Sequence, residues 1–190
     1  AELEDRERPS AYHTLRFTVT DDGSELLIDT TRPELLAACV AVVANPDDER
    51  YQPLKGRTIT TPVYGVEVPL VFHSLADPEK GTGLAMICTF GDLTDVTWWR
   101  ELNLDTRAVI GRNGRFVEDV PAGFGPDAQE RYAELVGKTV NTGRDIVVGQ
   151  LRATGALVGE PRAITHPVKF YEKGDKPLEI VTTRQWYIRN

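Results

Sequence analysis

The sequence of 190 residues is 41% hydrophobic and 27% charged, with a formal net charge of -7 at pH 7. This length and apolar content fit one compact domain with a core of its own. The acidic balance excludes a protein that holds nucleic acid by phosphate neutralisation alone, so any contact with RNA must be local.

The first half of the chain predicts a series of short strands. Residues 1–11 are polar and predict a flexible lead-in, after which YHTLRFTV alternates as a strand that ends in an Asp-Asp-Gly turn. A return strand at 26–29 would complete a hairpin and lead into a short helix over 34–38. Further strands are expected at 39–44, 58–61, 63–72 and 84–89.

The second half changes to helical periodicity. The run DLTDVTWWRELNL places its apolar residues on one helical face. Beyond it we expect a strand at 107–110, a GRNGRF hairpin, helices over 126–136 and 141–153, a left-handed Gly155, and extended segments at 163–171 and 178–182. Short strands interrupted by helices predict an α+β fold, with a mixed sheet or small β-barrel at the core and helices at its periphery.

The segment Thr31-Arg32-Pro33-Glu34 fits a helix capping box. In that motif the Thr31 hydroxyl accepts a hydrogen bond from the backbone N–H of Glu34, and the Glu34 side chain reaches back to the N–H of Thr31. This structural interpretation explains the motif by itself. A functional interpretation is compatible with it, because a helix N-terminus after a strand gathers N–H groups and hydroxyls that can bind an oxygen-rich ligand or a developing oxyanion.

Two further segments are candidates for a site. Gly81-Thr82-Gly83 lacks the third glycine of a dinucleotide fingerprint and the lysine of a phosphate loop, but two glycines allow a backbone to approach a ligand closely. Asp92 and Asp95 flank the start of the predicted helix, where a carboxylate is ordinarily a cap. One of them could instead face a cleft and accept a hydrogen bond from a ligand's ammonium group.

The sequence lacks the residue patterns of metal binding, disulfide bonding, covalent catalysis and membrane insertion. Cys39 and Cys88 lie in separate apolar runs and form neither a metal-ligand pair nor a disulfide framework, which predicts a reduced cytoplasmic protein. The three histidines have no metal-ligand spacing, and no Gly-x-Ser-x-Gly elbow supplies a nucleophile. No apolar run approaches the roughly 20 residues of a membrane span. We therefore expect no metal site, no covalent catalysis and no membrane contact.

Three motifs occur in an order typical of one protein family: TTRPELL at 30–36, GTG at 81–83 and GDLTD at 91–95. Together they resemble the editing domain inserted in the class I aminoacyl-tRNA synthetases for valine, isoleucine and leucine, and TRPELL with the ending EIVTTRQWYIRN is most similar to the valyl form. The resemblance implies an editing domain at 12–183 and, at 184–190, the start of the return segment to the catalytic domain. The HIGH and KMSKS motifs of ATP-dependent aminoacylation are absent.

The resemblance also implies a role for each matching residue. Asp95 matches the aspartate that binds the amino group of the misattached amino acid, and Asp92 matches a second acidic position. The two walls of the family's site contact the aminoacyl group and the terminal adenosine. They are matched by Thr30, Thr31 and Arg32 on one side and by Gly81, Thr82 and Gly83 on the other.

The implied function is hydrolysis of mischarged Thr-tRNA(Val) without a cofactor, with the tRNA(Val) acceptor end and the rest of the synthetase as partners. Met86 and Gly91 depart from the commoner valyl pattern, which has a lysine and a histidine there, while Leu35 argues against a leucyl-type domain. Three alternatives stay open. They are an isoleucyl-type domain that hydrolyses Val-tRNA(Ile), a non-catalytic tRNA-binding insertion, and an unrelated small-molecule hydrolase.

Overall fold

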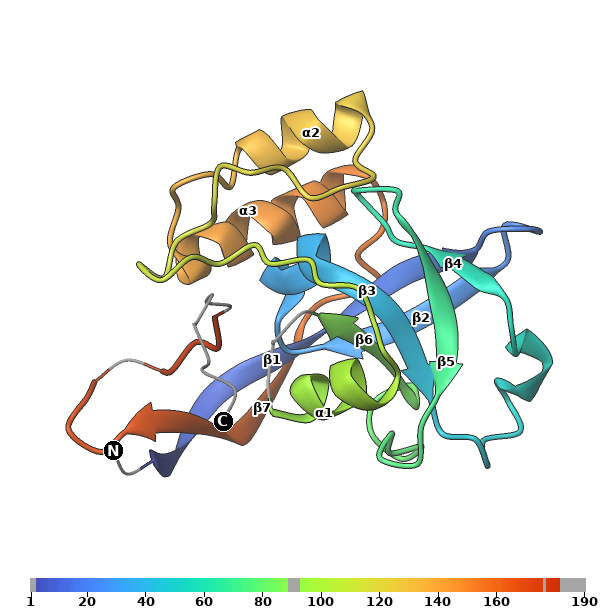
Figure 1. Cartoon of the computed structure of the whole chain (residues 1–190), viewed down its shortest axis with the longest axis horizontal. Helices are drawn as coiled ribbons and strands as arrows, with labels where there is room; N and C mark the ends of the chain where they lie inside the picture. The colour runs from blue at the N-terminus through green and yellow to red at the C-terminus, as the bar shows by residue number, and fades with distance from the viewer. Residues whose placement is uncertain (1–2, 89–92, 176, 182–190) are drawn as a thin grey trace, which may run out of the picture.

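A computed structural model describes residues 3–88, 93–175 and 177–181 (Figure 1). Its centre is a mixed seven-stranded sheet with the strand order β2-β1-β4-β5-β3-β6, and β7 pairs with β1 outside this path. The strands are β1 Leu3–Val19, β2 Glu25–Thr30, β3 Cys39–Ala44, β4 Thr58–Thr60, β5 Glu67–Phe72, β6 Leu84–Cys88 and β7 Arg162–Tyr171. The helices are η1 Pro33–Ala38, η2 Gln52–Leu54, α1 Leu93–Glu101, α2 Pro126–Ala133 and α3 Val140–Ala153. The expected α+β fold class is confirmed.

The sheet curls into a half-barrel around an apolar core. Leu15 and Phe17 of β1 are fully buried and lie opposite Ile28 and Leu26 of β2, so one face of this hairpin is apolar. β3 is buried along its whole length between the parallel β5 and the antiparallel β6, which explains its uninterrupted CVAVVA run. The curl brings β6 beside β2, at the opposite end of the strand order.

β1 is much longer than expected. Residues 3–11, for which a flexible lead-in is predicted, are extended and pair antiparallel with β7. The guanidinium groups of Arg6 and Arg8 each lie 4.9 Å from the ring centre of the buried Phe170. This stretch forms a two-stranded ribbon with β7 that extends away from the barrel (Figure 1). Because the ribbon lies outside the barrel core, its residues can be polar. The predicted boundary at residue 184 lies outside the described residues.

A helical lobe made of α2 and α3 covers the η1 end of the sheet (Figure 1). The Thr139 hydroxyl caps α3 by accepting a hydrogen bond from the N–H of Thr142. Tyr132 and Leu151 are fully buried in the lobe, and Gly155 adopts the expected left-handed conformation with φ +70°. None of the helices in the described parts of the chain is long and apolar enough to cross a membrane.

Two local predictions were wrong in detail. The strand expected at 107–110 does not form: within that range only Ile110 makes an isolated bridge, to Phe116, as the chain turns toward the lobe. The helix expected over 126–136 ends at Ala133. Of the extended segment expected at 178–182, residues 178–181 are neither helix nor sheet strand, and residue 182 lies outside the described residues.

Candidate functional site

The turn between β2 and η1 carries the TTR motif. Thr30 is the last residue of β2 and pairs with His13 of β1, so both side chains lie on the face that carries the core. The Thr30 hydroxyl accepts a hydrogen bond from the backbone N–H of Arg32 at 3.0 Å. Thr31 is partly buried in the same turn. A threonine hydroxyl thus stabilises the turn, but it is Thr30 that does so, two residues before the bonded N–H.

The predicted capping box was wrong. The N-cap residue of η1 is Arg32, whose side chain makes no capping hydrogen bond, and η1 is a 3-10 helix rather than an α-helix. The side chain of Glu34 does not turn back to Thr31, because two arginines bind it. It accepts hydrogen bonds from Nε and an Nη of Arg144 at 2.9 and 2.8 Å and from Nε of Arg32 at 3.1 Å.

Glu34 is the most deeply buried charge near the turn, since its side chain is 0% exposed. Burial alone would raise the pKa of this carboxyl, but the hydrogen bonds from Arg144 and the charges of Arg32 and Arg144 outweigh it and lower the pKa. Glu34 is therefore ionised at neutral pH. It connects the β2–η1 turn to the helical lobe.

Arg32 is bound by two carboxylates from distant parts of the chain. Besides Glu34, its guanidinium donates to Glu179 at 2.7 Å, and its side chain remains 26% exposed. Burial alone would lower the pKa of Arg32, but Glu34 and Glu179 raise it. The predicted wall residue Arg32 is thus a fixed cation at the edge of the site.

The Gly81-Thr82-Gly83 segment packs against protein on both sides. Gly81 has φ +59°, and a Cβ placed on it would lie 2.9 Å from Cβ of Asp29. Gly83 has φ +83°, and its Cβ would meet an Nη atom of Arg50 at 2.5 Å. The glycines allow a close approach as predicted, but the atoms that they approach belong to this chain.

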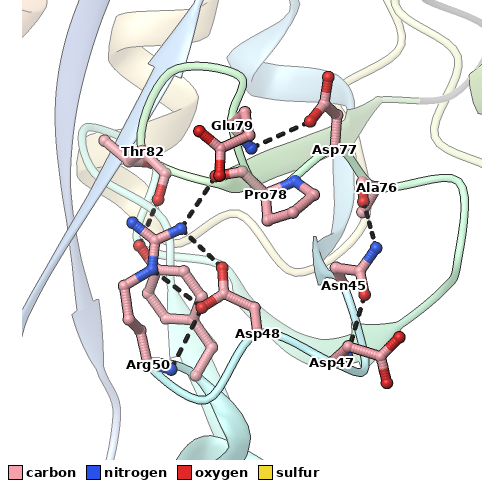
Figure 2. A network of polar contacts seen from close by, with 10 residues as sticks. Asn45, Asp47, Asp48, Arg50, Ala76, Asp77, Pro78, Glu79 and Thr82 are labelled. Carbon is pink, nitrogen blue, oxygen red and sulfur yellow. Dashed lines mark hydrogen bonds and ion pairs between the residues drawn. The ribbon is translucent and has the colours of Figure 1, made fainter.

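Figure 2 shows how the wall around Thr82 is held. Arg50 donates to both carboxylate oxygens of Asp48, at 2.9 and 2.7 Å, and to the carbonyl of Pro78 at 2.9 Å. The Tyr51 hydroxyl donates to the carbonyl of Thr82. The hydroxyl of Thr82 itself is buried and has no hydrogen-bond partner among the described residues.

Asp29 fixes the position of the glycine segment relative to β2. It accepts hydrogen bonds from the hydroxyl of Thr14 and from an Nη atom of Arg162, the latter at 2.7 Å, and its side chain is only 4% exposed. Since Gly81 lies against Asp29, and Asp29 directly precedes Thr30, the structure brings the GTG segment to the end of β2 that carries the TTR turn.

Asp95 lies on α1, which packs against β6. Its residue is 7% exposed and lies in the first turn of the helix. The pKa of Cys88 is raised, mainly by a hydrogen bond with Cys39 and then by burial. The charge of Asp95 raises this pKa further, and the charge of Arg32 lowers it. The charges of Asp95 and Arg32 thus both reach Cys88, the last residue of β6. Asp92 and Gly91 lie outside the described residues, so their predicted roles stay predictions.

The assembled groups can orient an ester but offer no evident nucleophile. Both cysteines are buried and free, and the raised pKa of Cys88 keeps that thiol protonated. Burial and the nearby Arg144 charge lower the pKa of His13, whose Nδ1 has no hydrogen-bond partner among the described residues. A surface hollow lined mainly by residues of the 111–118 hairpin, with Val136 and Gly137, includes none of the predicted site residues.

Sequence reasoning missed three residues around the site, Asp29, Arg144 and His13, and the ion-pair role of a fourth, Glu34. Asp29, Glu34 and Arg144 take part in its ionic contacts, and His13 lies opposite Thr30. A charged residue inside an otherwise apolar run, such as Glu34 within PELLAACVAVV, was the one local signal of a buried ion pair. Nothing local indicates Arg144, because it lies 110 positions away.

Among known proteins, the sequence relatives of this chain are valine–tRNA ligases. No protein-family model matches the sequence. The chain is 66% identical over 191 aligned residues to a valine–tRNA ligase of Thermobifida fusca (strain YX), and 64% identical to that of Leifsonia xyli subsp. xyli (strain CTCB07). Both alignments cover 100% of this chain and 22% of the relative, so the chain spans about a fifth of the length of these proteins.

The fold has a counterpart among solved structures. The chain superposes with a TM-score of 0.57 on LeuRS in the crystal structure of the ternary complex of Agrobacterium radiobacter K84 agnB2 LeuRS-tRNA-LeuAMS, at 17% sequence identity. The superposition covers 84% of this chain and 20% of that one.

Proposed function

Because the chain matches one segment of valine–tRNA ligases over its full length, we propose that it is the editing domain of such a ligase and hydrolyses Thr-tRNA(Val). The observation that carries this proposal is the convergence of the three motifs. Gly81 lies against Asp29, which directly precedes the TTR turn, and the charges of Arg32 and Asp95 both act on Cys88 at the end of β6.

A valine enzyme needs a second site because of a limit on apolar recognition. A hydrophobic pocket cannot strongly reject an isostere that adds a hydroxyl, and the valine enzyme is the standard example, with only about a hundredfold discrimination against threonine. A site that hydrogen-bonds the threonine hydroxyl reverses the preference. Valine would leave those polar groups unpaired, at a cost of roughly 1–3 kcal/mol for each buried group.

The proposed reaction is direct hydrolysis of an activated ester. Asp95 binds the ammonium group of the amino acid, while Thr30, Thr31 and neighbouring backbone groups orient the carbonyl. The oxygen of a water molecule attacks the carbonyl carbon, the ester bond to the ribose breaks, and a proton passes to the departing ribose oxygen. Orientation of an ester that is already reactive supplies the rate, so neither a nucleophilic side chain nor a cofactor is required.

The remaining residues would recognise the rest of the substrate. Arg32 is a fixed cation beside the turn and would contact the terminal adenosine, with Gly81, Thr82 and Gly83 as the facing wall. The buried hydroxyl of Thr82 supports this arrangement, because it has no hydrogen-bond partner among the described residues and such a group needs one. Asp92 is the proposed discriminator of the threonine hydroxyl. The partners would be the tRNA(Val) acceptor end and the rest of a cytoplasmic synthetase.

Substrate choice tests the proposal against its alternatives. The full-length parent enzyme is incubated with Thr-tRNA(Val), Val-tRNA(Val) and Val-tRNA(Ile), and the loss of each ester is followed. We expect rapid loss of the threonyl ester alone. Loss of Val-tRNA(Ile) would identify an isoleucyl-type domain, and tRNA binding without loss of any ester would identify a non-catalytic insertion. Release of amino acids from free esters without tRNA would indicate a small-molecule hydrolase.

A further inference from the structure

The site contains a buried carboxylate that does not face the ester chemistry. Glu34 is 0% exposed and accepts three hydrogen bonds, two from Arg144 of α3 and one from Arg32 of the TTR turn. Full burial of an ionised carboxylate is costly unless every partner is in place. The fold therefore holds a fixed negative charge directly beside Arg32.

Carboxylates of two described residues hold Arg32 at different nitrogens. Nε contacts Glu34 at 3.1 Å, and an Nη atom contacts Glu179 at 2.7 Å. Two contacts at different nitrogens define both the position and the plane of a guanidinium group. An arginine side chain that is ordered in advance loses less rotamer entropy when a ligand binds, so the contact costs less free energy.

We propose that Glu34 is a positioning residue, which sets the orientation in which Arg32 contacts the terminal nucleoside of the aminoacylated RNA. Arg144 completes the coordination of Glu34, so that the carboxylate cannot rotate away from Arg32. This proposal rests on the proposed function, because it assumes that Arg32 contacts the RNA terminus. Glu34 touches no substrate; it acts through Arg32.

A double-mutant cycle in the full-length parent enzyme tests the proposal. Deacylation of Thr-tRNA(Val) is measured for the wild type, Glu34→Gln, Arg32→Met and the double variant. We expect each single substitution to lower kcat/KM by about tenfold, within the range of coupling between residues in contact. The double variant should be no more than about twofold below Arg32→Met, because Glu34 has nothing left to orient. A loss near the product of the two single effects would overturn the proposal.

A second readout separates positioning from loss of folded enzyme. A lost binding contact raises KM, whereas unfolding of part of the enzyme lowers the apparent kcat and leaves KM unchanged. We expect the change for Glu34→Gln to lie mainly in KM, and a change confined to kcat would contradict the proposal. If Glu34→Gln does not fold, Glu179→Gln takes its place in the cycle, since Glu179 is Arg32's other carboxylate partner. Its effect should likewise disappear in the Arg32→Met background.

The same cycle can be run without catalysis. The probe is 3′-deoxy-3′-(threonylamino)adenosine, an amide that cannot be hydrolysed like the ester, and its Kd is measured by calorimetry for each enzyme. We expect about tenfold weaker binding in both single variants and no further loss in the double variant. That result supports the positioning role even if the wild type hydrolyses no ester. In that case only the proposed function fails. Glu160→Gln, at an exposed pair with Arg152 on the lobe, is the matched control and should leave Kd unchanged.

Discussion

The carboxylate of Glu34 and the guanidinium of Arg144 form a two-pronged ion pair between residues 110 positions apart, with N–O distances of 2.9 and 2.8 Å. One partner lies in η1 and the other in α3, so the pair fastens the helical lobe to the turn that carries Thr30, Thr31 and Arg32. The lobe therefore belongs to the support of the candidate site, although it supplies none of the predicted site residues.

Removing Arg144 should destabilise the fold substantially. Among the described residues, Arg144→Met leaves the buried Glu34 with Arg32 as its remaining ion-pair partner, and loss of one partner of a buried pair costs on the order of 3 kcal/mol. Urea unfolding measures the difference in the free energy of unfolding. Arg152→Met is the control on the same helix; its partner Glu160 is 87% exposed, so we expect a change within about 0.5 kcal/mol. Equal effects of the two substitutions would contradict this account.

Stability should fall as the pH drops below neutral, partly because of His13. Burial, followed by the Arg144 charge, lowers the pKa of His13 from its ordinary value of 6.5. The unfolded chain then binds a proton near that pH while the folded chain does not, so the free energy of unfolding decreases from about pH 7 downward. His13→Gln should weaken this decrease in unfolding experiments between pH 7.5 and 5.5. Parallel pH profiles for both proteins would show that His13 titrates normally.

Glu34 adds a second acid-sensitive contribution at lower pH. Its pKa is lowered in the folded state, so the stabilisation is present above the unfolded value of 4.5 and is lost as the pH falls through the folded one. Glu34→Gln should therefore lose less stability than the wild type between pH 5 and pH 3. A steeper acid loss in the variant would contradict the lowered pKa.

A methyl group at Gly81 should cost more than the same change at Gly65. Both glycines have nearly the same backbone conformation, φ +59° and φ +61°, but a Cβ at Gly65 meets nothing within 4 Å. Gly65→Ala should lower the free energy of unfolding only by the strain of the left-handed backbone, roughly 1–2 kcal/mol. Gly81→Ala must also displace Asp29, which Thr14 and Arg162 hold in place, so we expect at least about 1 kcal/mol more. Equal losses on urea unfolding would show that Asp29 moves freely.

The elements that were predicted correctly are those specified by local pattern. β2, β3 and α3 follow from alternation, an unbroken apolar run and an amphipathic period, and Gly155 follows from helix termination. The polar N-terminal part of β1 carries no such signal, because its partner β7 lies at the far end of the chain. The capping-box prediction was wrong for a similar reason, because a partner of Glu34 lies far away in the sequence. Local spacing suits the Glu34 side chain to the backbone N–H of Thr31, whereas in the structure it binds Arg144, 110 positions away, and the adjacent Arg32.

The candidate site was predicted as a set of motifs rather than as a geometry. The order of TTR, GTG and Asp95 along the chain could suggest that they belong together, but only the curl of the sheet shows how Gly81 reaches Asp29. The roles of Thr30, Thr31, Asp92 and Asp95 in the reaction stay predictions.

The central claim is that Asp95 holds the substrate ammonium group during ester hydrolysis, and single-turnover release of threonine from Thr-tRNA(Val) tests it most directly. The full-length parent enzyme is compared with Asp95→Asn and with Asp105→Asn, which changes an exposed carboxylate. Loss of one charge-assisted hydrogen bond predicts a rate about a hundredfold lower for Asp95→Asn and an unchanged rate for Asp105→Asn. Threonine release at the wild-type rate by Asp95→Asn would contradict the account.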